Sequence, residues 1–304
     1  MNNLVAITGA FSYTGKYATR ILLKRGDQIR TLTFHPERPN PFGNHIAVFP
    51  YNFDRPEELR STLVGVSALI NTYWVRFPRG GMTFERAVNN SRTLITAARD
   101  AGVQRIVHVS IANPSLNSPL GYYRGKALVE QAVRESGMPY SILRPTVIFG
   151  AEDILINNIA WFIRHFPVFG IPGDGKYGVR PIYVEDMAKL LVDEADAEGD
   201  RVIDAVGPET FSFEELVQLI ASRIGGSVRL MHFPKFAAYA ATTVAGWFVR
   251  DTILTWEEYA GLMANLLAPT GAATGAIRLS DWLERNSDNV GKKYASEVAR
   301  HFSV

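Results

Sequence analysis

Apolar and polar positions along the chain alternate in a way that predicts strands separated by helices. Between the strands, apolar residues recur at the three- and four-residue spacing of a helix, as in residues 84–101. Short apolar runs of strand length occupy residues 4–7, 28–34, 46–49, 68–74, 105–109 and 140–143. Five alternations over about 140 residues are typical of a parallel sheet with helices on both faces, so we predict an α/β fold with a Rossmann-type doubly wound sheet.

The pattern changes near residue 150, where the regular alternation ends. The elements predicted for the second half are a helix at 154–166, a Gly- and Pro-rich loop at 169–176, a late strand at 202–205 and largely helical structure over 252–304. We therefore predict a first domain over residues 1–150, to which a strand and a helix around 178–206 return. Residues 151–304 are expected to form a smaller, mainly helical lobe.

Composition narrows the class of function. The chain has 304 residues, of which 47% are hydrophobic, a formal net charge of +2 and no cysteine. The balanced charge argues against a nucleic-acid partner, and the lack of cysteine removes disulfides, thiolate metal sites and cysteine nucleophiles. We predict no metal site. The N-terminal residues lead directly into a strand without the pattern of a signal peptide, so a cytoplasmic location is expected.

Residues 236–249 form an uncharged run between Lys235 and Arg250. A helix that spans a bilayer needs roughly 20 apolar residues, and this run is shorter and rich in Ala and Thr. We therefore predict a buried helix and no transmembrane segment. The alternatives are a groove for an apolar ligand and shallow peripheral contact with a membrane.

The first predicted turn carries candidate chemistry, because it joins a strand to a helix through glycines. Gly9 suits a positive φ, and Gly15 lets the helix begin close against the strand. The unpaired N–H groups and the dipole of the helix then face an anion such as a diphosphate. Ser12 occupies the place of a third glycine, and its hydroxyl, with those of Thr8 and Thr14, is a candidate phosphate ligand. The alternative is an ordinary strand-to-helix turn.

The end of the second strand bears on the choice of cofactor. An acidic residue here would accept hydrogen bonds from the adenosine ribose and repel a 2′-phosphate. The chain instead has Phe34 and His35, followed by Arg38. This favours NADP over NAD, with NAD as the alternative, while His35 and Arg38 can equally be plain loop residues.

A tyrosine and a lysine stand four residues apart after the fifth strand. On a helix, Tyr122 and Lys126 share one face. An ammonium group lowers the pKa of a nearby phenol, which allows the phenol to exchange a proton at neutral pH. The alternative is an amphipathic helix with a solvated lysine, and we expect the neighbouring Tyr123 to pack.

Taken in order, these motifs resemble those of a known superfamily. The segments TGAFSYTG, VNNSRTLITAARDAGVQRIVHVS, YYRGK, LRPTVIFG and GDGKYGVRPIYVEDMA are similar to the short-chain dehydrogenase/reductase superfamily, in its extended or atypical branch of NAD(P)-binding epimerase/dehydratase-like proteins. The resemblance covers about residues 4–191. It implies a substrate-binding lobe over residues 151–304 and an NAD(P)-binding domain over residues 1–150.

The resemblance also implies roles for individual residues. The expected catalytic set is Ser110, Tyr122 and Lys126, and Lys126 would also hold the nicotinamide ribose. Asp54 falls on an aspartate that contacts adenine. The full set of expected cofactor-binding residues is Thr8, Gly9, Phe11, Ser12, Tyr13, Thr14, Gly15, His35, Arg38, Asp54, Asn71, Thr72, Lys126, Pro145, Thr146 and Val147.

The function expected from this resemblance is that of an NAD(P)-dependent oxidoreductase or epimerase. Its substrate would be a small molecule of apolar or quinone-like character, and no oligomeric state is indicated. One departure bears on catalysis, because Ile111 follows Ser110 where the superfamily has a pair of serines. The branch also contains members that resemble the accessory subunit of respiratory complex I and redox-sensing regulators. The alternative function is therefore an NADP(H)-binding scaffold or redox sensor that acts through a protein partner.

Overall fold

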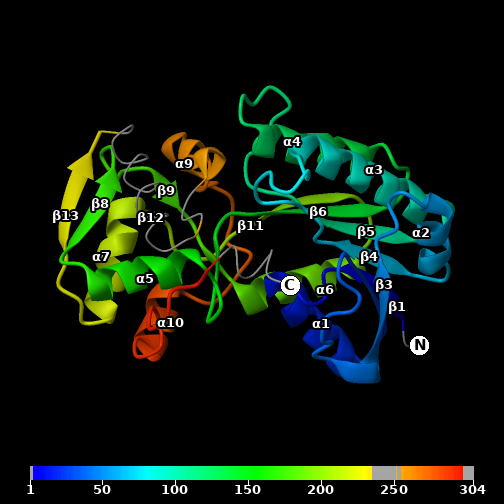
Figure 1. Ribbon diagram of the computed structural model, residues 1–304, viewed down its shortest axis with the longest axis horizontal. Coiled ribbons are helices and arrows are strands. Elements are labelled where there is room, and N and C mark those ends of the chain that lie inside the picture. Colours follow the sequence, from blue (N-terminus) through cyan, green and yellow to red (C-terminus); the bar gives the residue numbers. More distant parts are fainter. Residues whose placement is uncertain (1–2, 235–250, 252–254, 297–304) are drawn as a thin grey trace. The chain divides into compact units, whose positions relative to one another are not determined.

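The computed structural model describes residues 3–234, 251 and 255–296. The chain divides into two compact units (Figure 1). The first unit contains Met1–Pro145 and Val184–Ala205, and the second contains Thr146–Tyr183 and Val206–Val304. A segment from the second half of the sequence therefore completes the first unit.

The first unit is built on a seven-stranded parallel sheet with the order β11-β6-β5-β4-β1-β2-β3. Its strands are β1 (Leu4–Thr8), β2 (Gln28–Thr33), β3 (Ile46–Pro50), β4 (Ala68–Asn71), β5 (Arg105–Val109), β6 (Tyr140–Pro145) and β11 (Arg201–Ala205). The strand order reverses between β1 and β4, which is where ligands bind in open α/β sheets. The predicted doubly wound sheet is thus confirmed, and the late strand joins it as an edge.

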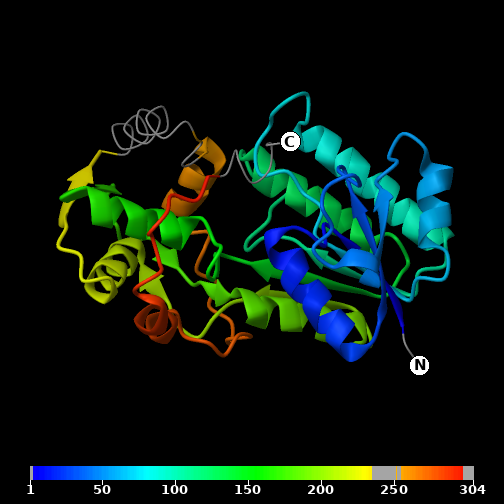
Figure 2. The same ribbon diagram turned by 60° about the horizontal axis from the view of Figure 1, so that its bottom comes forward.

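Helices cover both faces of this sheet (Figures 1 and 2). The helices of one face are α2 (Pro56–Leu63), α3 (Phe84–Asp100) and α4 (Gly121–Arg134), and those of the other are α1 (Tyr13–Arg25) and α6 (Val184–Ala195). A short 3-10 helix, η1 (Gly43–His45), precedes β3. Fully buried residues between the sheet and α3 and α4 include Leu69, Leu94, Ile106, Val129 and Ile142.

The second unit combines helices with three two-stranded sheets. The parallel pairs are β7 (Ile148–Phe149) with β10 (Ile182–Tyr183) and β8 (Val168–Pro172) with β13 (Arg229–Phe233), and the antiparallel pair is β9 (Gly178–Val179) with β12 (Phe211–Ser212). The described helices are α5 (Leu155–His165), α7 (Phe213–Arg223), α9 (Trp256–Met263) and α10 (Leu279–Asn286). A hydrophobic core of its own includes Phe149, Ile156, Val217, Trp282 and Leu283.

Three predicted elements differ from the structure. The predicted loop at 169–176 is wrong over residues 169–172, because β8 pairs along its whole length with β13, a partner about 60 residues later in the chain, whereas residues 173–176 form a turn and loop. Residues 252–304 are not largely helical in their described part, where α9 and α10 have eight residues each. The third is β4, which is predicted to reach residue 74 and ends at Asn71.

One further finding concerns membrane contact. Among the described residues, no helix combines the length and the apolar character needed to cross a bilayer. The predicted helix at 236–249 lies outside the described residues.

Candidate functional site

The corner between β1 and α1 is held together by backbone groups. Gly9 has a φ of 69°, as predicted, and its carbonyl accepts a hydrogen bond of 2.8 Å from the N–H of Ser12. A Cβ on Gly15 would lie 2.0 Å from the carbonyl oxygen of Gly9, so only glycine allows this approach. The Ser12 hydroxyl caps α1 by accepting from the N–H of Gly15 at 3.3 Å. The N-terminal end of α1, with its backbone N–H groups, therefore lies at one compact turn.

Other residues predicted for this corner surround the turn. Thr14 is in the first turn of α1, and Tyr13 begins the helix. The ring of Phe11 stacks with that of Phe42, with 6.5 Å between the ring centroids. Phe11, Tyr13 and Thr14 are all partly exposed, so a ligand at the turn can reach them.

Thr8 is fully buried at the end of β1, where it connects β1 to β4. Its hydroxyl accepts from the N–H of Thr72 at 2.6 Å and from that of Tyr73 at 3.0 Å, and donates to Oδ1 of Asn71 at 3.3 Å. The Thr72 hydroxyl donates in turn to the Thr8 carbonyl at 2.5 Å. The N–H groups of Thr72 and Tyr73 thus bond a side chain instead of a neighbouring strand. Strand β4 therefore ends at Asn71, three residues before the predicted end. In this conformation Thr8 holds two strand ends together and has no proton left for a phosphate.

The end of β2 presents aromatic surface and an imidazole beside a carboxylate. Phe34 is 48% exposed and packs against the rings of Tyr51, Phe53 and Tyr73, with centroid distances of 4.7, 5.9 and 5.9 Å. Nδ1 of His35 lies 3.4 Å from a carboxylate oxygen of Glu37. An acidic group is therefore close to the predicted ribose position after all, because Glu37 lies between His35 and Arg38 in the sequence.

The two other residues predicted for the adenosine end of the cofactor lie at the surface. Arg38, which follows β2, is partly exposed, and Asp54, which follows β3, is exposed. Both side chains are therefore accessible to a ligand.

Lys126 lies inside the first unit rather than in solvent. Its side chain is 3% exposed, its Nζ donates to the carbonyl of Val109 at 2.8 Å, and the same atom lies 4.8 Å from the centroid of the Trp74 ring. Burial lowers the pKa of Lys126 to about 7, while the charge of Glu130 opposes this shift. The alternative of a solvated lysine is excluded, and at neutral pH the amine is close to the midpoint of its titration.

Tyr122 lies one helical turn before Lys126 and is surrounded by rings. Trp74 and Phe84 both meet it edge to face, each with a centroid distance of 5.9 Å, and Tyr123 meets it at 5.8 Å. Trp74 packs so closely on α4 that a Cβ on Gly125 would lie 2.7 Å from the indole. Tyr122 itself is partly exposed, whereas Tyr123 is 2% exposed and packs as predicted. The phenol of Tyr122 is therefore the more accessible of the two.

Two polar atoms at the end of β5 are buried without a hydrogen-bond partner among the described residues. They are Oγ of Ser110, whose residue is 3% exposed, and Nε2 of His108, which is fully buried. Unsatisfied buried polar atoms are rare and often mark sites for a ligand or a water molecule. Ile111 follows Ser110, so the second serine of the superfamily has no counterpart here.

The remaining predicted residues follow β6. Pro145 ends β6 and its carbonyl accepts from the N–H of Ala112 at 2.9 Å. Thr146 and Val147 belong to the second unit, where the Thr146 hydroxyl donates to the carbonyl of Arg180. The Arg180 side chain is 9% exposed and donates to the carbonyls of Gly207, Pro269 and Gly271, so it ties loops of the second unit together.

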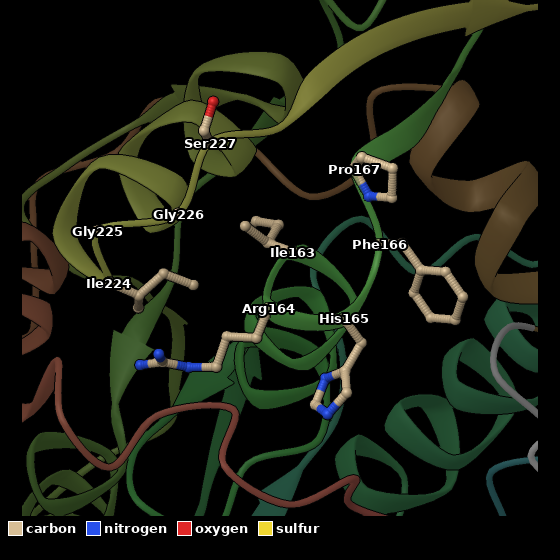
Figure 3. Close-up of a pocket in the computed structure, with 9 residues that line it drawn as sticks. All are labelled: Ile163, Arg164, His165, Phe166, Pro167, Ile224, Gly225, Gly226 and Ser227. Carbon is tan, nitrogen blue, oxygen red and sulfur yellow. The ribbon is translucent and has the colours of Figure 1, made fainter.

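The second unit has a hollow of about 490 Å³ at the end of α5 (Figure 3). None of the predicted site residues lines it. The residues that do are Ile163, Arg164, His165, Phe166, Pro167, Ile224, Gly225, Gly226 and Ser227. Arg164 already donates to the carbonyls of Ser287 and Val290, which leaves this hollow without a built polar site.

Sequence reasoning missed the residues that enclose Tyr122 and Lys126. Trp74 and Phe84 were assigned no role, and His108 was interpreted only as part of a strand. A signal for Trp74 existed, because it follows β4 at the carboxyl edge of the sheet. The position of His108 in β5, two residues before Ser110, places both side chains on one face of the strand.

The residues of the first unit fit a dinucleotide. The glycine corner leaves no room for Cβ at Gly15, which is the arrangement needed for close approach of a diphosphate to the helix start. Ser110 offers a buried, unpartnered hydroxyl at the same edge of the sheet. Both observations agree with a ligand that extends from the end of β1 toward the end of β5.

Comparisons with known proteins agree with this geometry. Residues 9–154 match a family described as NAD(P)H-binding. The Arabidopsis thaliana protein "NADH dehydrogenase (ubiquinone) 1 alpha subcomplex subunit 9, mitochondrial" is 25% identical over 243 residues, which are 76% of this chain and 60% of the relative. This chain therefore covers less than two thirds of that relative.

Solved structures share the fold. The Citrobacter sp. triphenylmethane reductase complexed with NADP(H) has a TM-score of 0.75 at 20% identity, over 92% of this chain and 99% of that one. The UDP-N-acetylglucosamine 4-epimerase of Methanobrevibacter ruminantium M1 has a TM-score of 0.65 at 16% identity, over 77% and 86%. The expected likeness to complex I accessory subunits and epimerases is confirmed, and residues 9–154, which lie mostly in the Rossmann-type sheet, are similar to the NAD(P)H-binding family.

Proposed function

We propose that this protein is an NADP(H)-dependent oxidoreductase of the extended or atypical short-chain dehydrogenase/reductase type. The observation that carries the proposal is the buried Lys126 one helical turn after the accessible Tyr122, at the carboxyl edge of a nucleotide-binding sheet. A buried amine has a large desolvation cost, which a purely structural position would rarely retain. The closely related alternative function is that of an epimerase that uses the same groups.

Each group has a definite task in this proposal. Gly9 and Gly15 admit the diphosphate, and Lys126 holds the nicotinamide ribose and stabilises the phenolate of Tyr122. Reduced nicotinamide, when bound, supplies a hydride to the substrate carbonyl carbon. Tyr122 donates its phenolic proton to the carbonyl oxygen, and Ser110 provides a hydrogen-bond donor at the end of β5. Pro145, Thr146 and Val147 are proposed to line the nicotinamide.

The proposed cofactor is NADP(H), with NAD as the alternative. Arg38 provides positive charge after β2, His35 provides a ring that can hydrogen-bond, and Phe34 provides apolar surface for the adenosine. Glu37 beside His35 opposes this preference, because a carboxylate repels a 2′-phosphate. The structural relative from Citrobacter is complexed with NADP(H), which supports the same choice.

The proposed substrate is a small, apolar or quinone-like molecule. The rings of Trp74, Phe84 and Tyr122 form an aromatic cluster beside the proposed acid. Such surface favours a planar, weakly polar substrate over a sugar. The remaining proposals from the sequence are a substrate-binding role for the second unit and a cytoplasmic location.

Substitution of Tyr122 by Phe tests the catalytic role. The variant keeps the ring that packs against Trp74 and loses only the hydroxyl. We expect turnover of a carbonyl or quinone panel with NADPH to fall at least about 100-fold, the range that general-acid catalysis contributes, while the NADPH dissociation constant stays within about twofold. Tyr123→Phe is the matched control and should keep its activity. Turnover retained in Tyr122→Phe would show that another group is the acid.

A second function is favoured by a specific observation. Ile111 stands where the superfamily that the sequence resembles has its second serine, and the Arabidopsis relative is named as a subunit of NADH dehydrogenase. The alternative is a scaffold or redox sensor that binds NADP(H) and signals to a protein partner. The distinguishing experiment incubates NADPH with the full chain and a broad carbonyl and quinone panel. Tight binding without oxidation favours the scaffold, and Ile111→Ser should then raise turnover if only that donor is missing.

A further inference from the structure

Trp74 contacts both members of the proposed catalytic pair. The centroid of its ring lies 4.8 Å from Nζ of Lys126, which is within the range of a cation–π contact. The ring also meets that of Tyr122 edge to face, with an interplanar angle of 89° and a centroid distance of 5.9 Å. One indole therefore joins two side chains that lie a helical turn apart on α4. The proposed function uses Trp74 only as apolar surface for the substrate.

The indole is fixed in this place by packing. Phe84, the first residue of α3, stacks nearly parallel to it, with an interplanar angle of 8° and a centroid distance of 6.1 Å. On α4, a Cβ on Gly125 would lie 2.7 Å from Cη2 and 3.1 Å from Cζ2 of Trp74, so the glycine admits the ring against the helix. Nε1 of Trp74 is buried without a hydrogen-bond partner among the described residues. The contacts of the ring, and not a hydrogen bond to a described residue, thus hold Trp74.

The ammonium of Lys126 has few other partners. Among the described residues, its one hydrogen bond runs from Nζ to the carbonyl of Val109 at 2.8 Å. An ammonium has three N–H groups, so two remain, and a buried charge with incomplete hydrogen bonding is costly. The negative face of an indole attracts the whole ammonium without forming a conventional hydrogen bond. The two remaining N–H groups therefore stay available for a ligand.

We propose that Trp74 is a positioning residue of the catalytic pair, whose π-face holds the ammonium of Lys126 and whose ring orients that of Tyr122. A carboxylate in the same place would also hold the ammonium, but it would occupy the N–H groups that the cofactor needs. This inference rests on the proposed function, since it assigns Lys126 and Tyr122 to the reaction.

Other charged and titratable groups lie on each element around Lys126. Glu130 on the same helix raises the pKa of Lys126, and Arg144 of β6 holds Glu130 through bonds of 2.9 and 2.6 Å. On β5, burial and the charge of Lys126 hold the pKa of His108 well below its usual range, so its imidazole is neutral. A substitution of Trp74 leaves all of these groups in the chain, so its effect on the titration of Lys126 reports the indole.

The test compares Trp74→Met with Trp74→Phe. Both variants keep apolar cover over Lys126, but only phenylalanine keeps an aromatic face, which attracts cations less than indole does. Nitrogen-15 NMR of labelled lysine in the full chain follows the titration of Nζ directly. We expect the midpoint in Trp74→Met to move about one pH unit lower than in the unmodified protein, with Trp74→Phe in between. Turnover with NADPH should fall about tenfold in Trp74→Met and less in Trp74→Phe.

Two results would overturn the proposal. Equal midpoints in the two variants, or a higher midpoint in Trp74→Met, would show that the indole only excludes water. In a Lys126→Met background, Trp74→Met should change NADPH affinity by less than about twofold. An equal loss of affinity in both backgrounds would show that Trp74 acts on the nucleotide directly and not through Lys126.

Failure of the proposed function is distinguishable from failure of this inference. If the unmodified protein binds no NADPH, the proposed function fails, whereas the titration of Nζ still decides whether the indole holds the ammonium. Thermal unfolding of each variant confirms that it is folded.

Discussion

At the β1–α1 corner the backbone makes the site, whereas at the β5–α4 corner buried side chains make it. The first corner depends on the φ of Gly9 and on the absence of a Cβ at Gly15. The second depends on Lys126 and His108, which are buried with few partners. The backbone corner recognises a feature common to all dinucleotides. In the proposed function the side-chain corner carries the proton chemistry, and burial of its amine has a cost in stability.

The largest expected effect is at the backbone corner. In Gly15→Ala the new Cβ would meet the Gly9 carbonyl at 2.0 Å, so β1 and α1 must separate. We expect the free energy of unfolding to fall by about 3 kcal/mol or more and NADPH binding to be lost. Gly102→Ala is the control, because its Cβ would meet nothing within 4 Å, so it measures only the strain of its own positive φ of 78°. Equal, mild losses in both variants would contradict the close approach.

Lys126→Met should separate stability from binding. Burial lowers the pKa of Lys126 from 10.5 to about 7, so between these values the unfolded chain binds more protons than the folded one. Folding stability therefore rises with pH across this window, and the full cost of the buried charge applies below about pH 7. Methionine removes the charge and should raise the free energy of unfolding at pH 6 by about 1–4 kcal/mol.

The same variant should weaken NADPH binding at least about tenfold, because the ribose loses its ammonium partner. Urea unfolding at pH 6 and pH 9, with calorimetry at pH 6, measures both effects. Unchanged stability at pH 6 together with an unchanged pH slope would show that the folded protein does not bury a titrating amine at this position.

A smaller effect is expected after β2, where charge selects the cofactor. Arg38→Ala should reduce affinity for NADPH about fivefold and leave NADH binding nearly unchanged, because only NADPH has a 2′-phosphate. Glu37→Gln is the matched change on the acidic side and should improve NADPH binding. Parallel calorimetric titrations with both nucleotides measure the ratio. Equal changes for NADPH and NADH would place the 2′-phosphate elsewhere.

Ser12→Ala should have the smallest effect and sharpens the description of the backbone corner. The hydroxyl caps α1 through the N–H of Gly15, and loss of such a cap costs about 1 kcal/mol. Ser12→Gly should cost only a few tenths, since glycine is tolerated as a cap. Chemical unfolding measures both. A loss of NADPH affinity without a loss of stability would instead assign the hydroxyl to the phosphate.

The backbone corner could be predicted from the sequence, and the side-chain corner only in part. Gly9, Ser12 and Gly15 act on their immediate neighbours, so their spacing is enough to predict the turn. Lys126 was found through its spacing from Tyr122, but its burial depends on Trp74, which lies about 50 residues earlier. Such long-range packing leaves no local pattern.

The same reason explains the errors. The β8–β13 pair joins residues far apart in the sequence, and the early end of β4 depends on the Thr8 hydroxyl. Thr8 was predicted as a phosphate ligand because the sequence does not show that groups at the end of β4 form hydrogen bonds with its hydroxyl.

Chemical-shift mapping of the full chain with NADPH tests the central claim most directly, because it locates the nucleotide on both corners at once. With amide and lysine nitrogen labels, saturating NADPH should shift the amides of Gly9, Ser12 and Gly15 together with the Nζ resonance of Lys126. Tight binding that leaves these four signals unchanged would contradict the account.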